Sequence, residues 1–259
     1  MPFVEIGDFR AHYALSGPAE SPVLVLSNSL GTNFSMWDPQ LPEFEKRLRV
    51  LRYDTRGHGQ SSVTPGPYRI EQLGRDVLHI LDRLNIDRAH FCGLSLGGMT
   101  GMWLGVHARE RLHKLVLCNT AARIGTADVW NVRIEAVRKG GMKSIAPAVI
   151  ERWFTPAFRA AAPEAVARTE RMIEATSSEG YAACCAAVRD TDQRETISSI
   201  NTPTLVICGA LDPATPPADG QFLATKISGA RCVELPTAHL SNVEAAAQFS
   251  SEVIRFLAG

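Results

Sequence analysis

Residues 90–98 read His-Phe-Cys-Gly-Leu-Ser-Leu-Gly-Gly and join a short apolar run to a longer stretch rich in Gly, Met and Leu. Ser95 stands between Gly93 and Gly97, two positions from each. A sharp turn from strand to helix imposes backbone angles that are costly for a residue with a side chain, and nearby glycines let the backbone approach closely. The stretch therefore predicts a nucleophile elbow, a turn that exposes the Ser95 hydroxyl at its tip.

Short apolar runs recur on both sides of this elbow, with turn signals or helical patterns between them. They cover residues 3–6, 12–15, 23–27, 50–53, 90–92, 114–118, 205–208 and 231–235. The later runs are continuous rather than alternating, as in parallel strands covered on both faces, and helices at about 70–84, 96–107 and 242–257 supply the cover. The pattern predicts an α/β protein with a mostly parallel sheet of about eight strands.

The alternation stops between Cys118 and Leu205, where residues 123–197 read as successive helices rich in Ala, Arg and Glu. We interpret this segment as a helical cap inserted into a core formed by residues 1–122 and 198–259. Ligands of open α/β sheets bind beyond the carboxyl ends of the strands. An insertion that follows the sixth strand is therefore expected to roof the site and to help choose the substrate.

A serine hydroxyl needs a base within hydrogen-bonding reach and a third group that orients the base. Asp212 follows the apolar run 205–208, and His239 follows the last predicted strand, just before a helix that begins near Asn242. The order Ser, Asp, His, each after a separate strand, is the order of α/β-hydrolases. We therefore predict a catalytic triad of Ser95, Asp212 and His239.

Other interpretations of the two partners stay open. Asp212 could instead form a turn before Pro213, and His239 could be a polar residue that flanks a helix. Asp54, which ends another strand and opens a Gly-rich loop, is interpreted as a structural residue and kept as the alternative acid. The other histidines are interpreted as structural or solvent-facing.

The oxyanion of a tetrahedral intermediate needs backbone N–H donors, one from the residue after the nucleophile and one from the loop after the third strand. These donors are predicted to be Leu96 and Leu30, with an uncertainty of one residue for Leu30. The loop around Leu30 could also be only a tight turn.

Composition excludes several partner classes. The chain has 27 basic and 27 acidic residues among 259, so no net charge favours nucleic acid or an anionic membrane surface, and a small-molecule partner is expected.

The start of the sequence resembles no leader peptide and no run is long enough to span a bilayer, so a cytoplasmic location is expected. The spacing of the six cysteines predicts reduced thiols, and no metal or organic cofactor is expected. The sequence carries no signal for an oligomeric state.

These features together resemble the α/β-hydrolase superfamily, including its Asp-x-Arg-Gly-x-Gly-x-Ser loop at residues 54–61. Residues 93–99, 119–125, 128–134, 152–156 and 212–217 more closely resemble bacterial 3-oxoadipate enol-lactonases. The segments in the predicted cap are the more specific ones, because they lie where the substrate is chosen. One departure is Asn28-Ser29, where many hydrolases carry His-Gly; this changes the oxyanion loop without removing its amides.

The resemblance implies hydrolysis of 3-oxoadipate enol-lactone to 3-oxoadipate, in bacterial breakdown of protocatechuate and catechol. Such a small anionic lactone needs one cation and an apolar wall. Trp130 and Arg133 would share a helix face, so we expect Arg133 to pair with the carboxylate while Trp130 and Trp153 line the ring. The arginines could equally be solvated, and the tryptophans could be core residues of the cap.

Two other functions fit the same residues. A general carboxylesterase or a carbon–carbon bond hydrolase would use the same triad, and a protein without catalytic activity could retain the fold and bind a ligand in its pocket. The sequence also allows direct attack by water instead of an acyl-enzyme.

Overall fold

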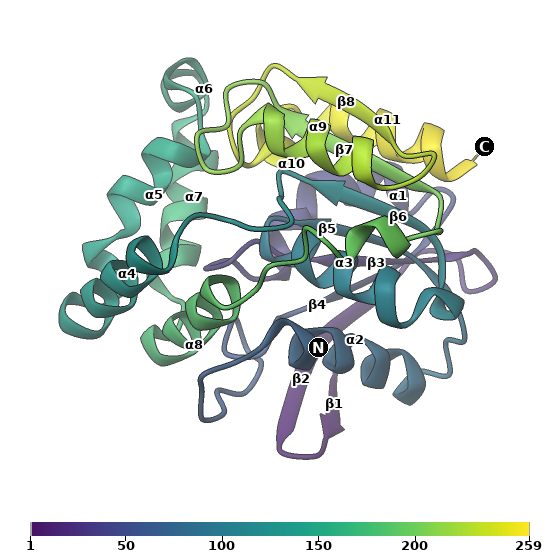
Figure 1. The fold of residues 1–259 in the computed structure, drawn as a ribbon, viewed down its shortest axis with the longest axis horizontal. Helices are drawn as coiled ribbons and strands as arrows, with labels where there is room; N and C mark the ends of the chain where they lie inside the picture. The colour runs from purple at the N-terminus through teal and green to yellow at the C-terminus, as the bar shows by residue number, and fades with distance from the viewer. Residues whose placement is uncertain (1, 259) are drawn as a thin grey trace.

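The computed structural model describes residues 2–258, which form one eight-stranded sheet with helices on both faces (Figure 1). The strands are β1 Phe3–Ile6, β2 Phe9–Ser16, β3 Val23–Ser27, β4 Arg49–Tyr53, β5 Ala89–Leu94, β6 Leu112–Cys118, β7 Thr204–Gly209 and β8 Arg231–Leu235. Their spatial order is β1-β2-β4-β3-β5-β6-β7-β8. The pairs β1–β2 and β2–β4 are antiparallel, and the others are parallel. The predicted eight-stranded, mostly parallel sheet is confirmed.

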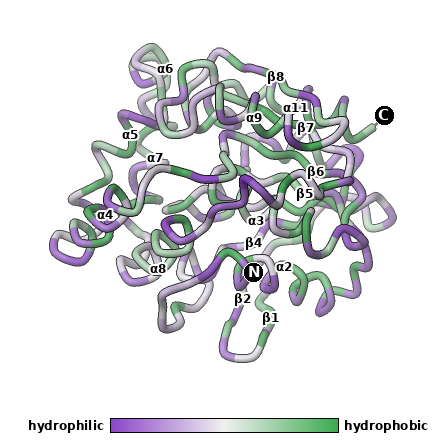
Figure 2. Tube along the Cα trace, in the orientation of Figure 1, coloured by the Kyte–Doolittle hydropathy of each residue, from purple (hydrophilic) through white to green (hydrophobic). Residues whose placement is uncertain are grey.

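The helices of the core are α1 Leu41–Phe44, α2 Ile70–Arg83, α3 Leu96–His107, α9 Pro217–Lys226, α10 Ser241–Glu244 and α11 Ala246–Ala258. Helix α3 packs on β3, β5 and β6, and α9 packs on β7 and β8. In Figure 1, α2 and α3 lie in front of the sheet and α1 and α11 lie behind it. The central strands are therefore covered on both faces, which explains their continuous apolar sequence (Figure 2).

Two details of the sequence interpretation were wrong. Strand β8 is not covered like its neighbours: Arg231, Cys232 and Glu234 are exposed, because β8 is the edge strand and has only β7 beside it. The helix expected at 242–257 is two helices, α10 and α11, separated at Ala245, whose backbone angles are φ −127° and ψ 50°.

Five helices connect β6 to β7 and form a separate layer at the left of Figure 1. They are α4 Ala127–Gly140, α5 Ala146–Trp153, α6 Pro156–Ala161, α7 Pro163–Glu174 and α8 Ser178–Arg189. Short 3₁₀ helices occur at Phe34–Gln40, Arg109–Arg111, Met142–Ser144 and Ile197–Ser199. We call residues 127–189 the helical insertion.

The insertion is fastened to the core by close backbone contacts. Gly57, in the loop after β4, faces Gly180 of α8 so closely that a Cβ on either residue would overlap the other backbone. Tyr68 N donates a hydrogen bond to Ala183 O at 3.2 Å. The Gly-rich loop at 54–61 therefore forms part of the surface on which α8 packs.

None of the helices in residues 2–258 combines the length and the apolar character that crossing a bilayer requires.

Candidate active site

Ser95 lies at the junction of β5 and α3 with φ 57° and ψ −111°, outside the regions that residues with side chains usually adopt. Its amide donates to Cys118 O of β6 at 2.9 Å, which ties the strained residue to the neighbouring strand. A Cβ at Gly93 would overlap the carbonyl of Gly97, and a Cβ at Gly97 would overlap that of Ser27. The two glycines are therefore required by close backbone packing, as expected for an elbow.

Asp212 and His239 come together from the loops that follow β7 and β8. His239 Nδ1 lies 2.7 Å from Asp212 Oδ2, and both residues are buried. Asp212 also accepts hydrogen bonds from Asn119 Nδ2 at 3.0 Å, from Thr215 Oγ1 at 2.7 Å and from the Ala214 amide at 2.8 Å. Burial opposes ionisation of this carboxyl group, but the nearby His239 charge and the hydrogen bonds lower its pKa to about 2. Asp212 is therefore a carboxylate that can orient the imidazole.

A cavity of about 230 Å³ is lined by Ser95 and His239 together. The residue Ser95 is 9% exposed, and the His239 ring lies 6.0 Å from the ring of Trp153, centroid to centroid. In the described part of the chain, Ser95 and His239 share no direct hydrogen bond. Catalytic hydrogen bonds are often loose without substrate and tighten in the complex.

The amides of Leu30 and Leu96, which the sequence predicts as oxyanion donors, are both free to donate. Across residues 2–258 neither has a hydrogen-bond acceptor, although the neighbouring amides of Gly31, Ser95 and Gly97 all do. Gly97 N donates to Asn28 O at 3.0 Å, and this bond holds the loop after β3 against the start of α3. Leu30 and Leu96 both border the serine, because Leu30 lines the same cavity and Leu96 follows Ser95 directly.

The departure at Asn28 is explained by packing. Its Nδ2 donates to Tyr53 O at 2.8 Å, and its Oδ1 accepts from Trp37 Nε1 at 3.0 Å. The amide side chain therefore fastens the loop to β4 and to the first 3₁₀ helix, away from the cavity.

Asp54, the alternative acid, is engaged elsewhere. Its Oδ2 lies 2.7 Å from His12 Nδ1 and accepts from Gln60 N at 2.9 Å, while its Oδ1 accepts from Phe34 N at 2.8 Å. Within the same loop, Arg56 pairs with Asp76 of α2 rather than with Asp54. Asp54 joins three segments of the core and does not contact His239.

The helical insertion supplies the far wall of the cavity. Trp130 and Arg133 lie on α4, with the Arg133 guanidinium carbon 5.2 Å from the Trp130 ring centroid, and both line the cavity with Trp153. Trp130 Nε1 donates to Ile124 O at 2.6 Å, so its indole is held in place. The three residues singled out in the sequence therefore border the serine from the insertion side.

Two further residues of this wall were not singled out as binding residues from the sequence. Arg152 and Tyr181 line the cavity from α5 and α8. Burial and the nearby charge of Arg133 lower the pKa of Arg152, so the two guanidinium groups are close enough to repel. Neither arginine pairs with a carboxylate among the described residues, and no acidic residue lines the cavity. For Arg152 the signal was its place in the segment 152–156, which resembles enol-lactonases, next to Trp153.

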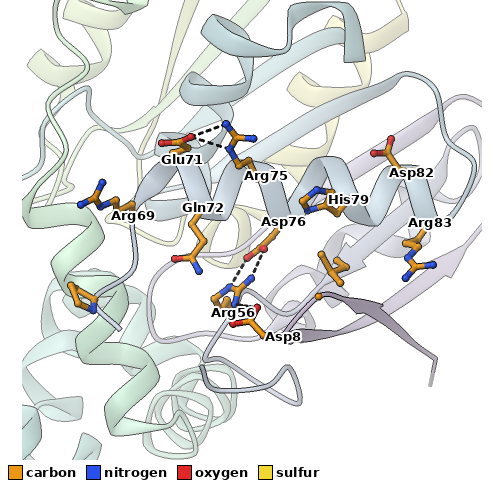
Figure 3. Close-up of a pocket in the computed structure, with 13 residues that line it drawn as sticks. Asp8, Arg56, Arg69, Glu71, Gln72, Arg75, Asp76, His79, Asp82 and Arg83 are labelled. Atoms are coloured by element: carbon orange, nitrogen blue, oxygen red, sulfur yellow. Dashed lines mark hydrogen bonds and ion pairs between the residues drawn. The ribbon is translucent and has the colours of Figure 1, made fainter. Parts of the chain in front are cut away.

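A larger cavity of about 790 Å³ lies elsewhere, between α2 and the turn after β1 (Figure 3). Four of its charged groups pair with one another: Arg56 with Asp76, and Arg75 with Glu71. It contains no serine or cysteine, so size does not make it the site of chemistry. For residues 2–258, no group of three His, Cys, Asp or Glu side chains is arranged to hold a metal ion.

The site combines a serine at a sharp turn from strand to helix with a buried His–Asp pair and two unpaired amides. All of them lie at one end of a mostly parallel sheet, and this is the arrangement of an α/β hydrolase. The profile of the alpha/beta hydrolase fold family matches residues 22–246. The chain belongs to this family and, within it, to the 3-oxoadipate enol-lactonases.

The relatives are similar over almost the whole chain. 3-Oxoadipate enol-lactonase 2 of Acinetobacter baylyi is 47% identical over 95% of this chain and 92% of that protein. 3-Oxoadipate enol-lactonase 1 of the same organism is 41% identical over 91% of this chain and 88% of that protein. The crystal structure of the enol-lactonase from Burkholderia xenovorans LB400 has a TM-score of 0.98 at 46% identity and covers 100% of both chains.

Proposed function

We propose that this enzyme hydrolyses 3-oxoadipate enol-lactone to 3-oxoadipate, in the bacterial pathway that degrades protocatechuate and catechol. The observation that carries the proposal is the two-sided cavity: Ser95 and His239 line one side, and two arginines without acidic partners line the other. A small lactone with one free carboxylate matches both sides. The identity of 47% to a curated enol-lactonase supports the same substrate.

The size of the cavity also supports a small substrate. About 230 Å³ lies below the range of roughly 300–1,000 Å³ that is typical of sites for drug-sized ligands. The indoles of Trp130 and Trp153 would pack against the lactone ring, while Arg133 and Arg152 would bind the carboxylate.

In the proposed mechanism, His239 Nε2 accepts the Ser95 hydroxyl proton as the serine oxygen attacks the lactone carbonyl. Asp212 holds the Nδ1–H and stabilises the imidazolium that forms. The Leu30 and Leu96 amides donate to the oxyanion. Collapse of the intermediate breaks the ring C–O bond and releases the ring oxygen as an enolate, which remains part of the acyl-enzyme.

The leaving group makes this step favourable. Its negative charge is delocalised over the enolate, so it needs less protonation than an alkoxide would. The enolate takes up the proton that His239 holds, and its conversion to the ketone removes the nucleophile that could close the ring again. Water then attacks the acyl-enzyme carbonyl while His239, now neutral, accepts a proton from it, and His239 passes that proton to the Ser95 oxygen as the acid is released.

We propose that residues 123–197 act as the cap of this site. The proposal is supported by the five helices between β6 and β7 and by their residues on the wall of the cavity. The cytoplasmic location expected from the sequence stays a prediction, as does the expectation of no nucleic-acid or membrane partner.

The test is hydrolysis of synthetic enol-lactone, with the rate measured from the acid that the reaction releases. Wild type should prefer this lactone, by kcat/KM, over aryl esters and over ring-cleavage products with a scissile carbon–carbon bond. Ser95→Ala should lower kcat by several powers of ten and leave product binding intact. Near-native turnover by Ser95→Ala would show that Ser95 is not the nucleophile. A preference of wild type for another substrate class would show that the lactone is not its substrate.

A further inference from the structure

Gly31, the residue after the proposed oxyanion donor Leu30, is held from both sides. Its amide donates to His58 Nε2 at 3.0 Å, and its carbonyl accepts from Thr176 Oγ1 at 3.1 Å. His58 belongs to the core loop after β4, whereas Thr176 belongs to the turn between α7 and α8 of the helical insertion. Both side chains are buried. One peptide segment is thus held by the core and the insertion together.

The His58 ring has a defined role in this contact. Its Nε2 accepts the Gly31 proton, so Nδ1 carries the ring proton and faces Arg56 O at 3.2 Å. Burial disfavours the charged imidazolium and lowers the pKa of His58 to about 4. The ring is therefore neutral near neutral pH and can act as the acceptor.

The orientation of the Leu30 amide follows from the same segment. The Ser29 carbonyl and the Leu30 N–H belong to one planar trans peptide, so they point in opposite directions. The carbonyl accepts from Thr32 N at 3.2 Å and from Thr32 Oγ1 at 2.7 Å. With that peptide held by Thr32 and the next one held at Gly31, rotation about Leu30 is restricted on both sides.

Tyr181 of the insertion packs on the same segment. The Tyr181 ring covers Gly31 so closely that a Cβ there would lie 3.0 Å from Cε2, and Gly31 has φ +85°. Beside this contact, a cavity of about 410 Å³ separates the residues after Gly31 from the end of α7. The Thr176 hydroxyl is therefore a local link across an incompletely filled boundary. Its single proton is shared with Met172 O, also at 3.1 Å.

We propose that Thr176 is a positioning residue for the oxyanion hole: it holds Gly31 against His58 and thereby aims the Leu30 N–H at the reacting carbonyl. The hole is then complete only when the helical insertion is seated on the core. This inference rests on the proposed function, because it assigns Leu30 as an oxyanion donor. It gives the insertion a part in the chemistry besides choosing the substrate.

The decisive variant is Thr176→Val, which keeps the shape of the side chain and removes the hydroxyl. Loss of a whole oxyanion donor lowers kcat by about 100- to 1,000-fold, so a misaimed donor should lower kcat by about 10-fold. KM should change by less than about two-fold, since the ground-state carbonyl depends less on this donor. Thr176→Ser restores the hydroxyl and should recover most of kcat.

Thr169→Val is the matched control. Thr169 is a buried threonine of α7 whose hydroxyl donates to Ala165 O of its own helix at 3.0 Å. The Thr169→Val variant should have a lower free energy of unfolding than wild type and an unchanged kcat. Equal losses of kcat in Thr169→Val and Thr176→Val would make the effect a general loosening of the insertion and would overturn the proposal.

Two measurements separate this proposal from that of the substrate. The kinetics are repeated with p-nitrophenyl acetate, an ester that uses the oxyanion hole whether or not the lactone is the natural substrate. Hydrogen exchange of the Gly31 amide is measured without any substrate and should be faster in Thr176→Val than in wild type or Thr176→Ser. If wild type hydrolyses p-nitrophenyl acetate but not the lactone, the substrate assignment is wrong. Unchanged Gly31 exchange in Thr176→Val sinks the positioning role.

Discussion

Residues 2–258 contain two buried His–Asp pairs with the same Nδ1 to Oδ2 distance of 2.7 Å, His239–Asp212 and His12–Asp54. Their surroundings differ. His239 lines the cavity that contains Ser95, whereas the His12 ring lies 4.9 Å from the ring of Phe34 and 5.0 Å from that of Phe3, centroid to centroid. Among residues 2–258, His12 Nε2 is buried with no hydrogen-bond partner.

The comparison shows that a His–Asp pair is not a catalytic unit by itself. Catalysis also needs a nucleophile at the free imidazole nitrogen and donors for the developing charge. The Asp54 carboxylate instead binds the amides of Phe34 and Gln60, so that pair joins segments of the core. Similar local geometry therefore occurs once beside the proposed nucleophile and once between segments of the core.

The largest expected difference comes from removing one carboxylate charge at a time. Asp212→Asn should lower kcat by about 10,000-fold, because the amide favours the wrong imidazole tautomer. Asp54→Asn should leave kcat within a few-fold and lower the free energy of unfolding by about 3 kcal/mol, because it breaks a buried pair. Turnover of the lactone and thermal unfolding measure both. A large loss of kcat at correct folding in Asp54→Asn would contradict the assignment.

A third buried histidine, His58, sharpens the comparison because it has no carboxylate partner. Burial lowers its pKa from 6.5 to about 4, so the unfolded chain binds the proton more readily. The contribution of His58 to the free energy of unfolding should be constant above pH 6.5 and should fall by about 3 kcal/mol as the pH drops from 6.5 to 4. Burial also lowers the pKa of His90 to about 4, so the His58 contribution is the difference between wild type and His58→Gln. Urea unfolding of wild type and His58→Gln across this range is the measurement. A pH dependence that His58→Gln leaves unaltered would exclude His58 as its source.

The pocket around His239 is also distinguished by its arginines. Arg133→Gln and Arg152→Gln should each raise KM for the lactone about 10- to 100-fold and should change kcat less. This rise corresponds to the loss of one hydrogen bond to a charged group. Arg138→Gln, an exposed change on the same helix as Arg133, is the control and should match wild type.

A neutral enol-lactone with methyl in place of the carboxymethyl group gives the second control. Because this analogue has no carboxylate, its KM should respond little to Arg133→Gln or Arg152→Gln. An equal rise in KM for both lactones would show that the arginines shape the cavity rather than bind charge.

The smallest effect is expected at the non-catalytic pair. His12→Asn keeps an N–H donor in reach of Asp54 and loses the ring that packs between Phe3 and Phe34, including Nε2, which has no partner within the described residues. The kcat/KM for the lactone should change by less than about two-fold, since His12 borders a different cavity from Ser95. A ten-fold loss would show that the two pairs are coupled.

Much of the site was accessible from the sequence because its parts are attached to strand ends. Ser95, Asp212 and His239 each follow a run of apolar residues, and in a parallel sheet the carboxyl ends of the strands meet at one edge. The positions of Trp130 and Arg133 on one helix face followed from their spacing. These inferences needed only periodicity and topology.

Arg152, Tyr181 and Thr176 were different. Each lies on a separate part of the helical insertion, and its spacing along the chain says nothing about which core loop it meets. The exposed edge of β8 was missed although Arg231 and Glu234 are charged, because this run was interpreted together with the continuous apolar runs that precede it.

The sequence by itself determined the strand ends, the turn that strains Ser95 and the chain order of the acid and the base, because these depend on local backbone preference and apolar periodicity. Only the tertiary structure showed that Arg152 and Tyr181 line the cavity beside Arg133 and how Gly31 is held between core and insertion. Those outcomes depend on contacts between segments far apart in the chain, and such contacts are set by packing that no local pattern records.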